Sequence, residues 1–227
     1  MATSGTTTFN PDLNEIVEEA FERCGAELRT GYDLRTARRS LNLLTAEWAN
    51  RGINLWTITT GSISLVAGTA TYNLPTDTID LVDQVIRTGS GTTQSDLSIS
   101  RIAVPTYATI PSKNDTGRPI QVYIDRKTTT PTITLWPIPD SVTPYTFVYW
   151  YMKRIDDAGT GVNTQEIPFR FYPCLIAGLA YYLSLKIPGA LERMAMLKQE
   201  YEEQWMLAST EDREKADLRL APRQQFL

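Results

Sequence analysis

The stretch YPCLIAGLAYYLSL, residues 172–185, is apolar on almost every side of the helix that it predicts. A helix that is apolar all round has to be buried, so this segment is expected to lie at the centre of a helical core. Ala177, Gly178 and Ala180 leave room for close approach of neighbouring backbones. Pro173 lacks the amide hydrogen that a helix interior requires, so the regular helix is expected to begin there, after an irregular turn.

Three amphipathic segments supply helices that can cover this centre. The first is expected to use Asn10 as its N-terminal cap and Pro11 in its first turn. The second begins near Asp33 and ends at Asn50 or Gly52. The third follows the break at Pro188-Gly189. The apolar positions recur at helical spacing in the three segments: Leu13, Ile16, Val17, Ala20, Phe21 and Cys24; Leu34, Ala37, Leu41, Leu44 and Trp48; Leu191, Met194, Leu197, Tyr201, Trp205 and Ala208.

Between the second helix and the central one, the hydrophobic period changes from helical to alternating. Short β-branched and aromatic runs are separated by links rich in Gly, Pro, Asn, Asp and Thr, which is typical of strands and turns. The predicted strands cover residues 62–66, 69–74, 81–87, 96–103, 119–125, 132–136 and 145–153, with a turn at Ala67-Gly68 between the first two.

These elements predict an α+β fold, with a core like a four-helix bundle and a β-rich, loop-rich insertion between helices 2 and 3. The helical bundle is assigned to residues 1–55 and 166–210, and the insertion to residues 56–165. Residues 211–227 are mostly charged and lack the apolar area to pack alone, so they are expected to form an extended C-terminal arm. The apolar run at 172–185 is shorter than a membrane span, so no membrane partner is expected.

Composition excludes several classes of function. The chain has 227 residues, a formal net charge of -4 and no histidine. An acidic balance argues against tight nucleic-acid binding, which needs clustered Lys and Arg. Without histidine, the chain lacks the commonest general base and the usual zinc ligand. Cys24 and Cys174 lack metal-ligand spacing and lie on apolar helical faces, so buried free thiols are expected.

The remaining candidate sites favour structural interpretations. The glycines of Gly89-Ser90-Gly91 and Gly159-Thr160-Gly161 do not continue into a phosphate-binding pattern, so both are interpreted as turns. Asp156-Asp157 and the glutamates near Glu202 do not make an acid/base pair by their spacing. The aromatic residues of the insertion could form a sugar-stacking platform, but core or subunit interface is preferred: Trp136, Tyr145, Tyr149, Trp150 and Tyr151. We therefore expect no catalytic residues, no cofactor and no metal.

The order and spacing of several longer segments resemble the head-to-tail adaptor family of tailed bacteriophages, the head-completion or upper tail-tube gatekeeper proteins of short-tailed phages. The segments are ARRSLNLLTAEWANRGINLW at 37–56, ATYNLPTDTIDLVDQVIR at 70–87, TGRPIQVYIDRK at 116–127, ITLWPIPD at 133–140, residues 167–188, YEEQWMLASTEDR at 201–213 and the tail at 219–222. Together they span nearly the whole chain.

The resemblance implies a structural virion protein at the head–tail junction, assembled in the host cytoplasm. Its partners would be the portal protein, neighbouring copies in a twelve-subunit ring, and the next tail component, a nozzle or tail tube. Double-stranded DNA would pass through the lumen without specific binding. The C-terminal arm would grip the portal, and its position suggests these contact residues: Arg213, Lys215, Arg219, Arg223, Phe226 and Leu227.

Two other functions remain open at this point. Another tail or baseplate subunit, without portal contact, would have the same composition. A carbohydrate-binding or carbohydrate-degrading module would use the aromatic residues of the insertion, and degradation would also need two carboxylates at a suitable separation.

Overall fold

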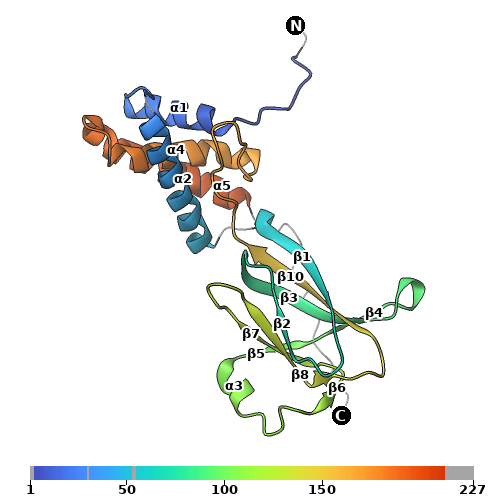
Figure 1. Cartoon of the computed structure of the whole chain (residues 1–227). Coiled ribbons are helices and arrows are strands. Elements are labelled where there is room, and N and C mark those ends of the chain that lie inside the picture. Colours follow the sequence, from blue (N-terminus) through green and yellow to red (C-terminus); the bar gives the residue numbers. More distant parts are fainter. Residues whose placement is uncertain (1–2, 30, 53–54, 213–227) are drawn as a thin grey trace. The chain divides into compact units, whose positions relative to one another are not determined.

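The computed structural model describes residues 3–29, 31–52 and 55–212 (Figure 1). The four longest helices and the strands occupy separate parts of the chain, which confirms the predicted α+β class. Contacts divide the chain into a helical unit, residues 1–55 with 156–227, and a β unit, residues 56–155. Residues 156–165, which the sequence pattern assigned to the insertion, fall in the helical unit. There Thr164 bridges to Asp12, and the Leu13 amide donates to the Asn163 carbonyl at 3.0 Å.

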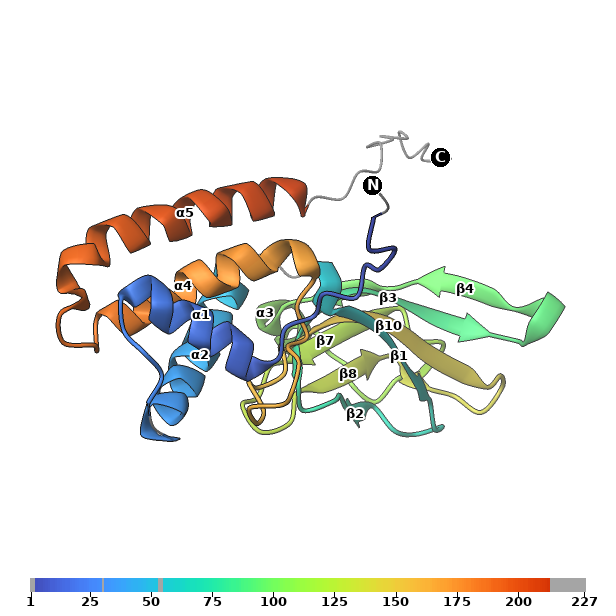
Figure 2. The same cartoon turned by 90° about the horizontal axis from the view of Figure 1, so that it is seen from above.

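The centre of the helical unit is α4, Tyr172–Ser184, as its all-round apolar surface predicts. It packs against α1 (Leu13–Cys24), α2 (Gly31–Arg51) and α5 (Met194–Glu211). Figure 2 shows α5 along one side of α4, with α1 and α2 on the other. Gly178 is needed at this crossing, since a Cβ there would lie 2.9 Å from both Leu44 and Tyr201 side-chain atoms. The predicted close approach of neighbouring helices is therefore confirmed.

The helix ends follow local chemistry. A short 3-10 turn, η3 (Phe169–Phe171), precedes α4, and Pro173 stands in the first turn of the helix, as predicted. Another, η4 (Ala190–Arg193), leads into α5. The predicted cap of α1 is wrong. Asp12 caps the helix, accepting from the Glu15 amide at 2.9 Å, while the Glu15 carboxylate accepts from the Asp12 amide at 3.0 Å. Asn10 instead accepts a hydrogen bond from the Tyr172 hydroxyl.

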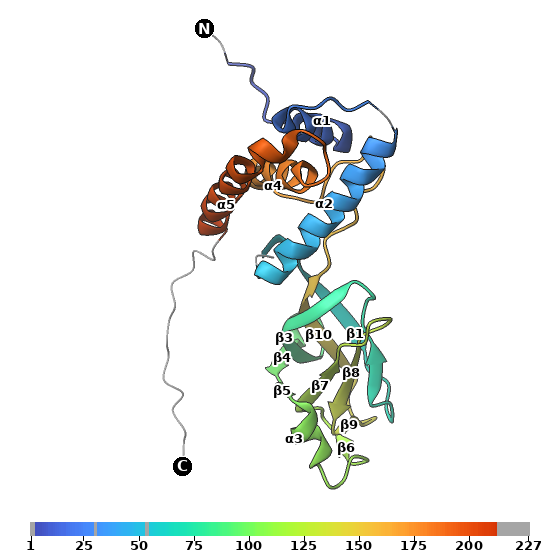
Figure 3. The same ribbon diagram turned by 90° about the vertical axis from the view of Figure 1, so that its left-hand side faces the viewer.

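The β unit consists mainly of two four-stranded sheets (Figure 3). The first has the order β1-β10-β3-β4 and is antiparallel. The second has the order β2-β8-β7-β5, in which β5 and β7 are parallel. The strands are β1 (Ile58–Ser64), β2 (Thr71–Asn73), β3 (Thr78–Thr88), β4 (Ser95–Ser98), β5 (Ser100–Ile102), β7 (Gln121–Asp125), β8 (Thr132–Trp136) and β10 (Tyr145–Lys153).

One shared core joins the two sheets. Buried side chains of β3 and β10 meet those of β7 and β8, so the unit is a sandwich: Leu81, Ile86, Phe147, Tyr149, Val122, Ile124, Ile133 and Leu135. The strands β8 and β10 have the predicted ends. The turn at Ala67-Gly68 joins strands of different sheets, because β1 pairs with β10 and β2 pairs with β8.

Several short elements complete the β unit. They are the 3-10 turns η1 (Leu55–Thr57) and η2 (Gly91–Thr93), the helix α3 (Val104–Ala108), and the parallel pair β6 (Thr116–Gly117) and β9 (Ile138–Pro139). The Trp136–Pro137 peptide bond, which joins β8 to β9, is cis. None of these elements has enough residues to show a hydrophobic period, so the sequence pattern did not predict them.

Candidate interaction surfaces

A polar network ties α2, α4 and α5 together. Glu47 accepts from the Tyr182 hydroxyl at 2.6 Å and forms an ion pair with Arg51 at 2.6 Å. Arg51 also donates to both carboxylate oxygens of Glu202 at 2.9 Å. Its guanidinium lies over Tyr201, whose hydroxyl accepts from the Trp48 indole at 3.1 Å. Each helix therefore contributes a directional contact that fixes its position against the others.

The network favours the protonated form of its two tyrosines and the charged form of Glu202. Burial and the hydrogen bond to Glu47 raise the pKa of Tyr182 to about 12. Burial, followed by the charge of Glu47, raises the pKa of Tyr201 still further. The hydrogen bond from Arg51 lowers the pKa of Glu202. Tyrosines that stay protonated and a carboxylate that stays charged do not exchange protons near neutrality, so the network acts as a structural clamp.

Both cysteines are buried free thiols, as predicted. Burial raises the pKa of Cys24 to about 11 and that of Cys174 to about 12. The Cys24 thiol also donates to the Ala180 carbonyl at 3.1 Å. Because the thiolate is the reactive form, these thiols are inert in the folded chain.

The aromatic residues of the β unit mostly form its core. Tyr145, Tyr149 and Tyr151 are buried along one face of β10, beside Phe147. Trp136 is half-buried, and its indole donates to the Ser112 carbonyl at 2.9 Å. Trp150, also half-buried, lies on the opposite face of β10. The preferred core interpretation is confirmed for the three tyrosines, which leaves them no exposed ring face on which a sugar could stack.

The glycine-rich segment Gly159-Thr160-Gly161 forms a turn that packs against α1. A Cβ at Gly161 would lie 2.4 Å from the Asn14 amide, so this glycine permits the contact between its turn and α1.

Within the part of the chain that the structure describes, no cluster of three His, Cys, Asp or Glu side chains could hold a metal ion. In the same residues, no helix is both long enough and apolar enough to cross a bilayer.

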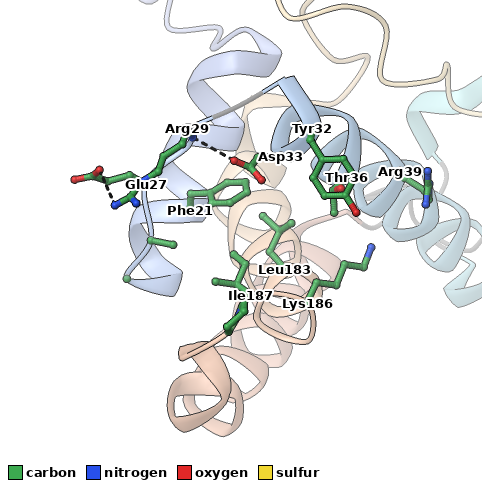
Figure 4. A pocket seen from close by; sticks show the side chains of 13 residues that line it. Phe21, Glu27, Arg29, Tyr32, Asp33, Thr36, Arg39, Leu183, Lys186 and Ile187 are labelled. Atoms are coloured by element: carbon green, nitrogen blue, oxygen red, sulfur yellow. Dashed lines mark hydrogen bonds and ion pairs between the residues drawn. The ribbon is translucent and has the colours of Figure 1, made fainter.

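A hollow of about 630 Å³ lies between the C-terminal end of α1, the N-terminal half of α2 and the C-terminal end of α4 (Figure 4). Its apolar wall is formed by Phe21, Leu183 and Ile187. Polar side chains surround that wall: Glu27, Arg29, Tyr32, Asp33, Thr36, Arg39 and Lys186. Glu27 pairs with Arg29 at 3.4 Å, and the Arg29 amide donates to Asp33 at 3.3 Å. The acidic groups of the hollow are therefore already engaged.

Two cations of the hollow lack a carboxylate partner among the described residues. Lys186 donates to the Ser40 hydroxyl at 2.7 Å, and burial, followed by the charge of Arg39, lowers the pKa of Lys186. Both side chains belong to exposed residues. This side of the hollow thus presents a positive pair beside an apolar wall.

The outward face of α5 is apolar and carries a negative charge, whereas the hollow carries a positive pair. Leu197, Tyr201 and Ala208 are buried on its inner face, whereas Met196, Met206 and Leu207 on the outer face are each at least 60% exposed. Glu203 lies among these three on the helix surface, and its partner within the described part of the chain is Gln199, which donates to it at 2.9 Å. We call these four residues, Met196, Glu203, Met206 and Leu207, the α5 stripe. The sequence pattern of α5 pointed to its inner face and missed this one.

The predicted portal-contact residues lie outside the described residues: Arg213, Lys215, Arg219, Arg223, Phe226 and Leu227. The last described residue before them, Asp212, is buried and forms an ion pair with Arg170. The structure therefore defines where the C-terminal segment starts and leaves its contacts as a prediction.

The family model described as SU10 adaptor protein matches residues 11–223, which is most of the chain. This chain belongs to the SU10 adaptor family. The predicted resemblance to phage head-to-tail adaptors is confirmed, and the adaptor is a structural protein of a tailed-phage virion.

The comparisons with solved structures and with curated proteins give weaker similarities than the family model. Among solved structures, the adaptor is similar to a chain in the neck of an empty GTA particle computed with C6 symmetry. The two share 11% identity and a TM-score of 0.29, over 83% of the adaptor and 87% of that chain. No curated protein matches the adaptor.

Proposed function

We propose that the adaptor forms a twelve-subunit ring beneath the portal and continues the DNA channel from the head to the tail. The observation that carries the proposal is the family match over residues 11–223, which includes both the helical unit and the β unit. A phage head–tail adaptor has to bind its own copies and two different neighbours. The proposed neighbours are the portal protein on one side and the next tail component, a nozzle or tail tube, on the other.

The segment from residue 213 onward is proposed to bind the portal. It contains Arg213, Lys215, Arg219 and Arg223 against only Glu214 and Asp217, so it can pair with portal carboxylates. Phe226 and Leu227 at its end can fill apolar pockets. Its start is fixed by the Arg170–Asp212 ion pair, which holds the end of α5 against η3.

Passage of DNA through the ring is proposed to involve no specific contact. The net charge of -4 repels phosphate at close range, and clustered cations would be needed to hold the backbone. The adaptor is proposed to work without catalysis. Thiols with raised pKa values and tyrosines that remain protonated support this interpretation. Assembly would take place in the host cytoplasm before the protein is found in the virion.

The proposal is tested by deleting residues 213–227 and leaving Asp212 in place, so that Arg170 keeps its partner. The deletion is expected to leave the helix content and the urea midpoint unchanged and to abolish co-sedimentation with portal-bearing heads. A second variant keeps the full length and changes four residues to Gln: Arg213, Lys215, Arg219 and Arg223. It tests whether portal binding needs the positive charges of the segment or only its length. Full binding by the deleted chain would remove the segment from portal recognition. Cryo-electron microscopy of particles then counts the subunits of the ring.

A further inference from the structure

The α5 stripe is an apolar surface that the described residues of the helical unit leave uncovered. Met196, Met206 and Leu207 each leave at least 60% of their surface in solvent, although α5 already buries its inner face against α4. Methionine side chains adapt to irregular neighbours, which suits them to a protein contact. Exposed apolar residues gathered on one face of a helix mark such a contact more often than scattered ones.

The charge at the centre of the stripe is also unpaired. Glu203 forms no ion pair within the described residues, unlike Glu200, which pairs with Arg23, and Glu202, which pairs with Arg51. A matching surface should therefore offer a cation beside an apolar wall.

The hollow between α1, α2 and α4 offers that combination. Arg39 and Lys186 have no carboxylate partner among the residues that the structure describes, and Phe21, Leu183 and Ile187 form the apolar wall. Its volume of about 630 Å³ can accept several side chains. None of the residues that line it belongs to α5. The hollow and the stripe are therefore two different patches of one unit, complementary in charge and both apolar.

We infer that the α5 stripe of one copy docks into the α1–α2–α4 hollow of the next copy, with Glu203 facing Lys186 and Arg39. Two different patches make a head-to-tail contact, which closes into a ring when the rotation per subunit allows it. A two-fold dimer would instead use one patch twice. This inference rests on the proposed ring and names the surfaces that form it.

The inferred contact is small. The stripe occupies one face of a helix that is about 27 Å long. An interface of this size is weak between free copies and becomes effective when a template holds the copies side by side. The adaptor is therefore expected to be monomeric alone and to form the contact on the portal.

A cross-linking experiment tests the pairing of the two patches. Met206→Cys and Thr36→Cys place one thiol on the stripe and one at the hollow, and the native Cys24 and Cys174 are too buried to react. On portal rings, a mixture of the two variants is expected to give cross-linked dimers with a short bismaleimide, whereas each variant alone gives none. A chain that has both changes is expected to give a ladder of oligomers. Cross-linking within one variant, or a complete ring without mixed cross-links, would overturn the inference.

Charge exchange provides an independent measurement. Lys186→Glu and Glu203→Lys are each expected to raise the adaptor concentration that half-fills portal rings by about tenfold, since like charges then meet. The double variant is expected to recover most of the loss. The matched control is Lys198→Glu, an exposed lysine of α5 about a third of a turn away from the stripe.

The outcomes separate the inference from the proposed function. If the unmodified adaptor forms no ring on the portal, the proposed function is wrong, and the inferred contact is wrong with it. If rings form normally in all the charge variants, only the assignment of the surfaces is wrong.

Discussion

The helical unit and the β unit are held together in different ways. In the helical unit, Glu47, Arg51 and Glu202 link α2 to α5, and Tyr182 joins α4 to the same network through hydrogen bonds that depend on direction. In the β unit, a buried cluster of apolar and tyrosine side chains lies between two sheets, and ion pairs such as Arg87–Asp96 lie on the strand surface. The difference suggests that single polar changes should disturb the helical unit, whereas the β unit should respond mainly to lost volume.

The largest expected effect comes from removing one large buried ring in each unit. Trp48→Ala and Phe147→Ala each empty a fully buried site, and we expect each to cost about 3–5 kcal/mol of unfolding free energy. Trp48→Ala should lie at the upper end, because the Tyr201 hydroxyl also loses a donor.

The unfolding free energy of both variants is measured by urea denaturation. Labelling of Cys24 and Cys174 then reports the helical unit alone, because the β unit contains no cysteine. Equal labelling rates in the two variants would mean that the units unfold as one, and the comparison would fail.

A smaller effect is expected from Glu47→Gln, which keeps the volume and removes the charge. Arg51 would retain only Glu202 as a charged partner, and Tyr182 would lose a charge-assisted acceptor. We expect a loss of about 1–3 kcal/mol, measured by urea denaturation. The matched control is Asp96→Asn in the β unit, whose more exposed pair should lower the midpoint much less. A Glu47→Gln midpoint equal to that of the unmodified chain would show that the network contributes nothing.

The smallest effect concerns pH. Arg51 lowers the pKa of Glu202 below its ordinary 4.5, and Arg87 lowers that of Asp96 below 3.8. A lowered folded pKa means that each pair stabilises the chain above these ordinary values. The contribution disappears as the pH falls through the folded pKa. Arg51→Gln and Arg87→Gln should each raise the pKa of the matching carboxyl in an NMR titration. Both shifts should shrink in 1 M salt, since the pairs are partly exposed.

Much of the architecture follows from periodicity in the sequence. The central position of α4 follows from its apolar surface, and the ends of β8 and β10 follow from their flanking turn residues. Sheet pairing could not be predicted in this way, because β1 and β2 are neighbours in the sequence yet join different sheets. The choice of Asp12 over Asn10 as a cap depends on Glu15, three residues later, a signal that the sequence does contain.

The candidate surfaces were harder to predict than the fold. The hollow is formed by residues between 21 and 39, from α1, α2 and their link, and by residues 183–188 far along the chain, so no local pattern indicates it. The α5 stripe was obscured because its methionines and leucine share the helix with a stronger inner pattern. A count of apolar residues on both faces would have revealed it. The predicted portal-contact residues depend on the resemblance and lie outside the described residues.

The ion pair between Arg170 and Asp212 has a mechanical consequence. Asp212 ends α5, and its buried carboxylate ties that end to η3, immediately before the central helix. Tension applied to the C-terminal segment would therefore pass into the middle of the helical unit instead of peeling α5 away from its last turn. Such an anchor would spread a load on this chain end over the four packed helices of the unit.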